Sequence, residues 1–301
     1  MDTVREPAKH NMTPSNPISG PVCRVGLIGR GIQGSRSPAM HSGEAAAQGF
    51  ELSYELLDLE QRNLSDAALP ALLQEAQGLG FAGLNITYPC KQAVIPLLDE
   101  LSEEARTIGA VNTVQFRSGK RIGYNTDASG FEESFRRGMP GAALSSVVQI
   151  GGGGAGAATA FAFLRLGARR LTIIDVAFER AQALASTLQR HFEDCEVRAG
   201  TDLQAALCNA DGILNATPLG MAKHPGSAVP AELLHSTLWV TDIVYFPIET
   251  QLLRAARAAG CRTLDGGGMA IFQAALAFEI FTGRTADPQR MRRQFELMAG
   301  P

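Results

Sequence analysis

The sequence has few cysteines and histidines, and neither type forms a group. The cysteines are scattered along the chain and make no CxxC pair: Cys23, Cys90, Cys195, Cys208 and Cys261. The five histidines make no HExxH or similar spacing. Metal centres built from these ligands depend on such spacings, so the sequence gives no support for a metal site. Cysteines used in this way are typical of reduced thiols in a cytoplasmic protein.

An excess of charge of one sign is also lacking. The chain carries 27 lysines and arginines against 30 aspartates and glutamates, and it contains no basic run. Nucleic acids and membrane surfaces are recognised by clustered positive charge. We therefore expect neither as a partner, and a small molecule is the expected ligand. A homodimer is left open as an assembly.

A membrane span and a signal peptide are not expected either. Residues 142–164 carry no charge, but four consecutive glycines after a β-branched run favour a strand, a turn and a helix. Residues 1–21 are polar and rich in proline, which excludes a signal peptide and predicts a disordered extension. At 301 residues and 45% hydrophobic content, the chain can build one large domain or two of ordinary size.

Apolar runs in the first half alternate with helical patterns. Strands are predicted over 22–29, 51–59 and 80–87, and helices over 37–49 and 69–77. A helix should start near Lys91 and another piece should cover 103–110. Two short β-like runs flank Ser118 and Gly119, which predicts a hairpin and makes this sheet mixed.

From Ser145 the alternation restarts with a β-α-β unit, which predicts a second α/β domain. The boundary is expected near Asp127. We therefore predict a first domain over 22–127, completed by the final helices at 269–301, and a second domain over 128–268.

The second domain opens with a glycine-rich turn. Gly151, Gly153 and Gly156 form a GxGxxG that follows an apolar strand and opens an alanine-rich helix. In this context the motif is typical of a dinucleotide site. Gly151 would permit the tight turn, Gly153 the approach of the pyrophosphate, and Gly156 close packing of the helix on the strand. A glycine turn without a ligand is the alternative.

Asp175 follows the next strand, where a carboxylate can bind the adenosine ribose hydroxyls. It would repel a 2′-phosphate, and the three residues after it include no arginine. NAD is therefore favoured over NADP. Arg180 could swing in and weaken this preference, and Asp175 could be an ordinary strand-end acid.

Hydroxyl, amide and amine groups gather in the first domain. Ser37 before Pro38 is predicted as a helix N-cap, and with Ser35 it could also bind an anion. Asn85 and Thr87 lie at the end of a predicted strand. Lys91 begins the next helix, where the helix dipole disfavours a cation, so a local role explains it poorly.

The ordered motifs "SRSPAMH", "NITYPCK", "GAVNT", "YNTD", the glycine turn, "NATPLGM", "VYFPIET" and "GMAIFQA" resemble the shikimate dehydrogenase family over about 22–298. They are most similar to its NAD-dependent quinate/shikimate branch. The resemblance implies an α/β fold with an N-terminal substrate domain containing a mixed sheet, and a Rossmann NAD-binding domain. It implies reversible oxidation of shikimate or quinate to the 3-dehydro ketone, in aromatic amino acid biosynthesis or quinate catabolism.

The resemblance also implies roles for individual residues. Lys91 and Asp127 would be the catalytic pair that exchanges a proton with the substrate hydroxyl. The expected substrate contacts are Ser35, Ser37, Asn85, Thr87, Asn112, Tyr245 and Gln273. The expected cofactor contacts are Gly151, Gly153, Gly154, Ala155, Gly156, Asp175, Arg180, Asn215, Thr217, Met221 and Gly268.

Alternatives to these roles remain. Asp127 could be a helix N-cap, and Asn112 and Gln273 could be internal amides of the fold. His41 is expected to be structural and Cys90 to be a buried, inert thiol.

Three positions depart from the family pattern: Ser42, Tyr88 and Cys90. They leave the substrate preference open. Ser37 stands where quinate-preferring relatives tend to carry threonine, which favours shikimate without excluding quinate. Two other functions stay open, namely a dehydrogenase of an amino-substituted ring and a catalytically silent NAD-binding sensor.

Overall fold

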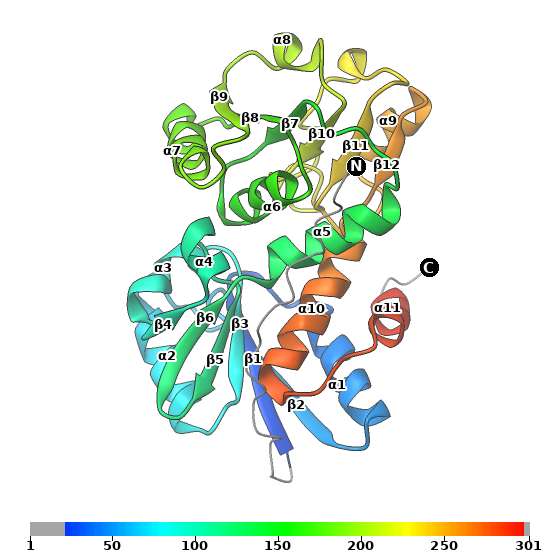
Figure 1. Ribbon diagram of the computed structural model, residues 1–301. Coiled ribbons are helices and arrows are strands. Elements are labelled where there is room, and N and C mark those ends of the chain that lie inside the picture. Colours follow the sequence, from blue (N-terminus) through cyan, green and yellow to red (C-terminus); the bar gives the residue numbers. More distant parts are fainter. Residues whose placement is uncertain (1–21, 298–301) are drawn as a thin grey trace, which may run out of the picture.

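Two six-stranded sheets organise residues 22–297, which the computed structural model describes (Figure 1). The extension predicted over 1–21 lies outside the described residues. The first sheet has the strand order β2-β1-β3-β5-β6-β4, and the second has the order β12-β11-β10-β7-β8-β9. The predicted α/β class with two domains is confirmed.

The first sheet is mixed, as predicted. Its strands are β1 (Val22–Gly29), β2 (Glu51–Asp58), β3 (Gly83–Ile86), β4 (Glu100–Leu101), β5 (Thr113–Arg117) and β6 (Lys120–Tyr124). Strand β1 pairs in parallel with β2 and β3, whereas β5 is antiparallel to β3 and β6. The hairpin turns at Ser118 and Gly119, whose φ angles of 50° and 78° suit the tight turn between two twisted strands.

Helices cover both faces of the first sheet. They are α1 (Ser37–Ala47), α2 (Leu69–Gly78), α3 (Cys90–Ala93) and α4 (Glu103–Ile108), with short 3₁₀ turns η1 (Asp66–Ala68) and η2 (Ile95–Leu97). On one face α1 packs with two C-terminal helices, α10 (Gly267–Thr282) and α11 (Pro288–Leu297). On the other face α2, α3 and α4 pack over β3. The C-terminal helices therefore return to the first domain, and α10 begins two residues before the predicted position.

The second sheet is entirely parallel. Its strands are β7 (Val147–Ile150), β8 (Arg170–Ile174), β9 (Glu196–Gly200), β10 (Gly212–Asn215), β11 (Trp239–Asp242) and β12 (Arg262–Leu264). Its helices are α6 (Gly154–Arg165), α7 (Phe178–Gln189), α8 (Leu203–Leu207) and α9 (Gln251–Ala258), with the turn η3 (Ala231–Leu233). The strand order reverses direction between β7 and β10, the point where doubly wound sheets bind ligands.

Helices α5 (Thr126–Gly138) and α10 lie side by side between the two sheets (Figure 1). Their backbones approach closely at two glycines. A Cβ at Gly130 would lie 2.7 Å from the Gln273 nitrogen, and one at Gly268 would overlap Ser134. Apolar side chains of α5 also enter the core of the second domain. The predicted domain limits stay a prediction, because α5 contacts both sides.

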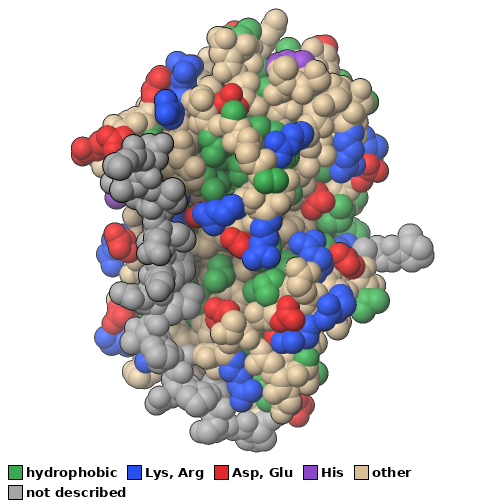
Figure 2. All heavy atoms as spheres, turned by 45° about the vertical axis from the view of Figure 1, so that its right-hand side comes forward, with side chains coloured by type: hydrophobic (Ala, Val, Ile, Leu, Met, Phe, Trp, Pro, Cys, Tyr) green, Lys and Arg blue, Asp and Glu red, His purple; other side chains and the backbone are tan. Residues whose placement is uncertain are grey.

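Charges are interspersed on the surface. On the face drawn in Figure 2, acidic and basic side chains alternate and do not gather into an area of one sign. Among the described residues, no helix has the length and apolarity needed to cross a membrane.

Helix α1 carries two buried side chains with very different surroundings. Glu44 is fully buried and accepts two hydrogen bonds from the guanidinium of Arg290, which fixes α11 on α1. His41 is also fully buried, but neither ring nitrogen has a hydrogen-bond partner among residues 22–297. Its ring packs against Tyr54, Phe278 and Phe281. Burial lowers the pKa of His41 to about 3, so the imidazole is neutral and structural, as predicted.

This histidine should make the fold sensitive to acid. The unfolded chain takes up a proton at His41 below pH ~6.5, whereas the folded chain does not until about pH 3. As the pH is lowered from about 6 to 4, the free energy of unfolding should therefore decrease by roughly 1.4 kcal/mol per pH unit. His41→Leu should remove this contribution. Urea denaturation at several pH values measures it.

Carboxylates titrate in the same range, so the difference between the wild-type protein and His41→Leu is the relevant quantity. The exposed His191 provides the control, and His191→Gln should keep the wild-type pH dependence. Equal slopes for wild type and His41→Leu would contradict the prediction.

Candidate active site

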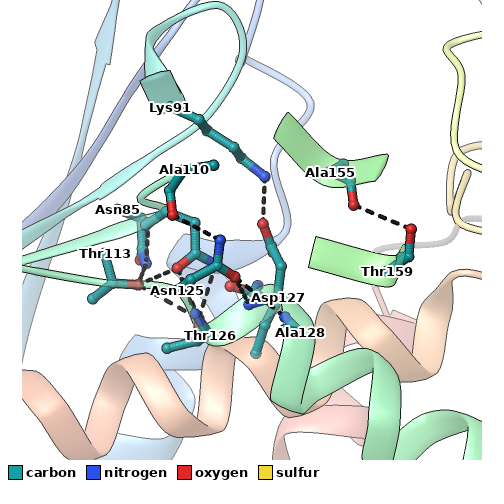
Figure 3. A network of polar contacts seen from close by, with 12 residues as sticks. Asn85, Lys91, Ala110, Thr113, Asn125, Thr126, Asp127, Ala128, Ala155 and Thr159 are labelled. Carbon is teal, nitrogen blue, oxygen red and sulfur yellow. Dashed lines mark hydrogen bonds and ion pairs between the residues drawn. The ribbon is translucent and has the colours of Figure 1, made fainter. Parts of the chain in front are cut away.

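Lys91 and Asp127 meet at the junction of the domains. Lys91 Nζ lies 2.5 Å from Asp127 Oδ2, and the two side chains are only 16% and 8% exposed. Lys91 comes from α3, directly after β3, and Asp127 comes from the first turn of α5. Figure 3 shows the two side chains pointing toward one another. The structure thus brings the predicted catalytic pair together.

Asp127 is not the N-cap of its helix. The cap is Asn125, whose Oδ1 accepts hydrogen bonds from the backbone nitrogens of Asp127 and Ala128. Because Asn125 performs the capping, the Asp127 carboxylate is left to face Lys91. The alternative interpretation of Asp127 as a cap is therefore wrong.

The segment 110–112 anchors both members of the pair. The Val111 nitrogen donates to the Lys91 carbonyl at 2.9 Å. Asn125 Nδ2 donates to the Ala110 carbonyl at 2.9 Å, and the Thr126 nitrogen donates to Asn112 Oδ1 at 2.8 Å. Two helices that are remote in sequence are thereby attached to the same short piece of chain.

The second domain touches the lysine directly. A Cβ at Gly154, the first residue of α6, would lie 3.3 Å from Cβ and Cδ of Lys91. The glycine therefore allows the lysine stem to lie against the nucleotide-binding turn. The ion pair is thus placed where both domains can act on one ligand.

A buried network of amides and hydroxyls lies beside the pair (Figure 3). Asn85 Nδ2 donates to Thr113 Oγ1 at 3.1 Å, and Asn85 Oδ1 accepts from the Tyr54 hydroxyl at 2.8 Å. Asn112 Nδ2 donates to Thr126 Oγ1 at 2.9 Å. The amides of the predicted substrate contacts Asn85 and Asn112 are therefore held in fixed orientations by hydrogen bonds to neighbouring hydroxyls.

Ser35 and Ser37 flank the start of α1, but not as predicted. The helix begins at Ser37 itself, and Arg36 is the N-cap residue without a side-chain cap bond. The Ser37 nitrogen donates to Ser35 Oγ at 3.3 Å. Ser37 is therefore not the N-cap, because Ser35 supplies the oxygen at this helix start.

Asp58 holds the loop that leads to these serines. Its carboxylate accepts hydrogen bonds from the nitrogens of Gly31 and Ile32 and from the Gln33 amide. Burial opposes its charge, but these bonds and one from Glu60 outweigh burial and lower the pKa of Asp58. The charged carboxylate at the end of β2 thus fixes the turn after β1.

The other three predicted substrate contacts lie around the same region. Thr87 follows β3 and is partly buried. The Gln273 backbone lies on Gly130, one turn beyond Asp127 in α5. Tyr245 is partly exposed; burial raises the pKa of its phenol, the Arg36 charge lowers it and the Asp127 charge raises it. The phenol is therefore close enough to both charges to respond to them.

The glycine turn has the local geometry expected of a dinucleotide site. Gly151 has a φ of +102° and lies on the Ala216 carbonyl, while a Cβ at Gly156 would overlap the Gly151 carbonyl oxygen. No atom lies within 4 Å of a Cβ built at Gly153, so the space before α6 is open there. Gln149 Nε2 donates to the carbonyls of Gly151 and Gly156 and fixes the turn.

Asp175 and Arg180 lie next to this turn. Asp175 accepts hydrogen bonds from the nitrogens of Gly152 and Ala177, both at about 2.8–2.9 Å. Arg180 Nη1 lies 3.4 Å from the same carboxylate, and its side chain is 54% exposed. The open space at Gly153, the helix start behind it and a carboxylate at the strand end fit a dinucleotide.

Asn215 and Thr217 organise the loop after β10. The Asn215 amide donates to Asp242 Oδ1 and to the Leu219 carbonyl, and its oxygen accepts from Thr217. Burial raises the pKa of Asp242 to about 6, although hydrogen bonds from Val244, Thr250 and Asn215 act in the opposite direction. Asn215 is fully buried, so its side chain shapes the loop rather than projecting from it.

Met221 and Gly268 occupy different surroundings. Met221 is 41% exposed and lines an open cavity of about 260 Å³ with Phe246, Pro247 and Arg254. This cavity does not include Lys91 or Asp127. Gly268 lies in the contact between α10 and α5, which by itself explains the absence of a side chain there. Their contacts with a cofactor stay predictions.

The thiol beside Lys91 has no redox role in this geometry. Cys90 is 1% exposed, and burial raises its pKa to about 11, so it is a neutral thiol as expected. Within residues 22–297, no group of three or more histidine, cysteine, aspartate or glutamate side chains could hold a metal ion.

Several contributors were missed by the sequence interpretation. They are Tyr54, Thr113, Asn125, Thr126, Arg36 and Gln149. Asn125 could have been recognised, because asparagine is a preferred N-cap and precedes an amphipathic helix. Thr113, Thr126 and Arg36 lie inside the quoted motifs, but the motifs gave them no role. The importance of these residues, and of Tyr54 and Gln149, depends on partners from remote elements.

The two glycines of the turn should respond differently to substitution. Gly153→Ala enters open space at a φ of -73°, so stability should change by less than about 0.5 kcal/mol while dinucleotide binding weakens. Gly156→Ala meets the Gly151 carbonyl and should destabilise the protein by about 1–3 kcal/mol even without ligand. Thermal denaturation and calorimetric titration with NAD distinguish the two effects. Equal loss of stability in both variants would refute this assignment.

Comparisons with known proteins agree with the geometry. Residues 27–114 match the shikimate dehydrogenase substrate binding domain, and residues 266–298 match the shikimate 5′-dehydrogenase C-terminal domain. A shikimate dehydrogenase (NADP(+)) of Streptomyces avermitilis is 54% identical over 278 residues, covering 92% of this chain and 96% of the relative. A quinate/shikimate dehydrogenase (NAD(+)) of Corynebacterium glutamicum is 49% identical over 275 residues, covering 90% and 97%.

A solved structure extends this similarity to the fold. The quinate dehydrogenase from Corynebacterium glutamicum in complex with NAD superimposes with a TM-score of 0.85 at 47% identity, covering 92% of this chain and 99% of that chain. Identity at this level over nearly the whole length confirms the resemblance drawn from the motifs. The chain belongs to the shikimate dehydrogenase family.

Proposed function

We propose that this protein is an oxidoreductase that interconverts a ring hydroxyl of shikimate or quinate with the 3-dehydro ketone, using NAD. The observation that carries the proposal is the Lys91–Asp127 pair, which is buried at the domain junction and touches the glycine turn through Gly154. Oxidation of a secondary alcohol requires a proton acceptor at the hydroxyl, and this pair provides one. The names of the relatives support the same substrates.

The substrate residues would hold the ring so that one hydroxyl faces the pair. We assign the carboxylate to the hydroxyls of Ser35 and Ser37 at the start of α1, where backbone nitrogens also favour an anion. The remaining contacts are assigned to the ring hydroxyls and to the wall of the site: Asn85, Thr87, Asn112, Gln273 and Tyr245. Because the buried network fixes Asn85 and Asn112, the ring would bind to oriented amides.

Lys91 and Asp127 act as one unit in proton transfer. During oxidation the substrate hydroxyl gives its proton to the pair, and during reduction the lysine ammonium returns a proton to the forming alkoxide. Because the two groups are in direct contact, we assign the proton to the pair rather than to either residue. Bound NAD would accept the hydride from the ring carbon that carries this hydroxyl.

The residues of the second domain favour NAD over NADP. Asp175 lies where the adenosine ribose is expected, so a 2′-phosphate would meet a carboxylate. Arg180 would offset part of this repulsion. The relatives include enzymes named for NADP(+) and enzymes named for NAD(+). The other assigned contacts are Gly151, Gly153, Gly154, Ala155, Gly156, Asn215, Thr217, Met221 and Gly268.

We also propose a cytoplasmic location, which the five free thiols support. The substrate domain is assigned to 22–127 with 269–301, and the Rossmann domain to 128–268. A homodimer is the assembly to test by light scattering. No observation favours an amino-substituted substrate or a silent sensor.

Substitution of Lys91 or Asp127 should suppress the reaction without weakening the binding of NAD. Lys91→Ala and Asp127→Asn should each lower kcat by roughly 10²–10⁴-fold, because each removes a member of the proton-transfer pair. NAD should bind with unchanged affinity. Steady-state rates with shikimate and quinate, together with calorimetric titration of NAD, measure both effects.

A matched surface pair provides the control. Lys120 Nζ also lies 2.5 Å from a carboxylate, that of Glu100, but both side chains are about half exposed. Lys120→Ala should therefore leave kcat unchanged. Undiminished activity of Lys91→Ala would remove the assigned role, and a wild-type protein that reduces no NAD with either ring acid would remove the proposed function.

The cofactor preference should depend on the charge of Asp175. Asp175→Asn keeps an oxygen that can accept a hydrogen bond from the turn but removes the negative charge, so kcat/KM with NADP should rise relative to NAD by about tenfold. Measurement of kcat/KM with both cofactors at saturating shikimate tests this. Arg180→Ala should shift the ratio in the opposite direction, and an unchanged ratio in Asp175→Asn would contradict the assignment.

A further inference from the structure

Arg36 is a buried cation next to the two serines of the proposed anion site. It lies between Ser35 and Ser37 in the chain and is only 4% exposed. Within residues 22–297, no carboxylate lies within ion-pair distance of its guanidinium. Its one hydrogen bond runs from Nη1 to the Phe295 carbonyl at 3.3 Å.

This arrangement differs from that of the other buried charge on the same helix. Glu44 is equally buried, but two nitrogens of Arg290 compensate it. An unpaired charge in a protein interior is strongly unfavourable, and such a charge is usually paired or bound to a ligand. Among residues 22–297, the charge of Arg36 is therefore not balanced by an acidic side chain.

Aromatic rings hold the guanidinium in place. Its central carbon lies 4.3 Å from the ring centroid of Phe295 in α11 and 5.7 Å from that of Phe246. Phe246 follows Tyr245, so Arg36 joins α1 to the segment after β11. These rings orient the cation but do not neutralise it.

The charge of Arg36 reaches the space assigned to the substrate. It acts on the Tyr245 phenol, which also feels the charge of Asp127 from the catalytic pair. The Tyr245 ring also lies 6.0 Å, centroid to centroid, from the ring of Phe295, on which Arg36 stacks.

We propose that Arg36 supplies the positive charge that balances the carboxylate of the ring acid bound by Ser35 and Ser37. The inference rests on the proposed function and names the residue that makes this site selective for an acid. Two serine hydroxyls can bind a neutral ester as well as a carboxylate. The guanidinium favours only the charged form, so it determines the preference.

The test compares an acid with its neutral ester. The ratio of kcat/KM for shikimate to that for methyl shikimate, with NAD, should fall by about tenfold to thirtyfold in Arg36→Met, as expected for one charge pair in a partly buried site. Most of the loss should be in KM for the acid, with kcat little changed. Arg36→Lys should restore much of the ratio. Where ester turnover is too slow, its inhibition constant against shikimate replaces kcat/KM.

A purely structural arginine would give a different result. If Arg36 only joined α1 to α11, Arg36→Met would impair acid and ester by the same factor, and that outcome would overturn the proposal. Arg36→Gln provides the same comparison should Arg36→Met not fold, as judged by thermal unfolding and NAD binding. A wild-type protein inactive with both ring acids would instead refute the proposed function.

A second arginine offers a matched control. Arg284 lies 4.5 Å from the Phe50 ring centroid and donates to the Gln48 carbonyl, and it belongs to the link between α10 and α11. Arg284→Met removes the same kind of stacked cation. The acid-to-ester ratio of this variant should equal that of the wild-type protein.

Discussion

The ion pair between Lys91 and Asp127 is the interaction on which the rest of the site depends. The two residues belong to different helices, and the segment that precedes each helix fixes its starting point. Strand β3 delivers Lys91, and the Asn125 cap delivers Asp127 in the first turn of α5. The amine and the acid therefore share a position that neither element could provide alone.

Close backbone approach is the second constraint. Gly154 lets the lysine stem lie on the nucleotide turn, Gly156 lets the turn lie on α6, and Gly130 lets α5 lie on α10. A side chain at any of these positions would move one layer away from its neighbour. The separation of these layers is thus determined by residues without side chains.

Most of the fold could be predicted from the sequence, because it follows local patterns. The apolar run 22–29 became β1 without a shift, and Ser118 and Gly119 formed the expected hairpin turn. The predicted catalytic pair was identified through its motifs, and the structure places its two members in contact. The cap at Ser37 was predicted wrongly, because the choice between Ser35 and Ser37 depends on a loop that Asp58 holds from another strand. Tyr54 and Arg36 could not be found, since their roles arise from remote partners.

The common anchor at 110–112 would keep the ion pair assembled if the two domains moved apart. Both members of the ion pair are attached to this segment, whereas Gly154 only rests against the lysine stem. A hinge motion that withdraws the nucleotide turn would break the contact with Gly154 and leave the pair assembled. Acid and amine would then be preorganised in an open enzyme, and lobe closure would add the hydride acceptor to an apparatus already complete for proton transfer.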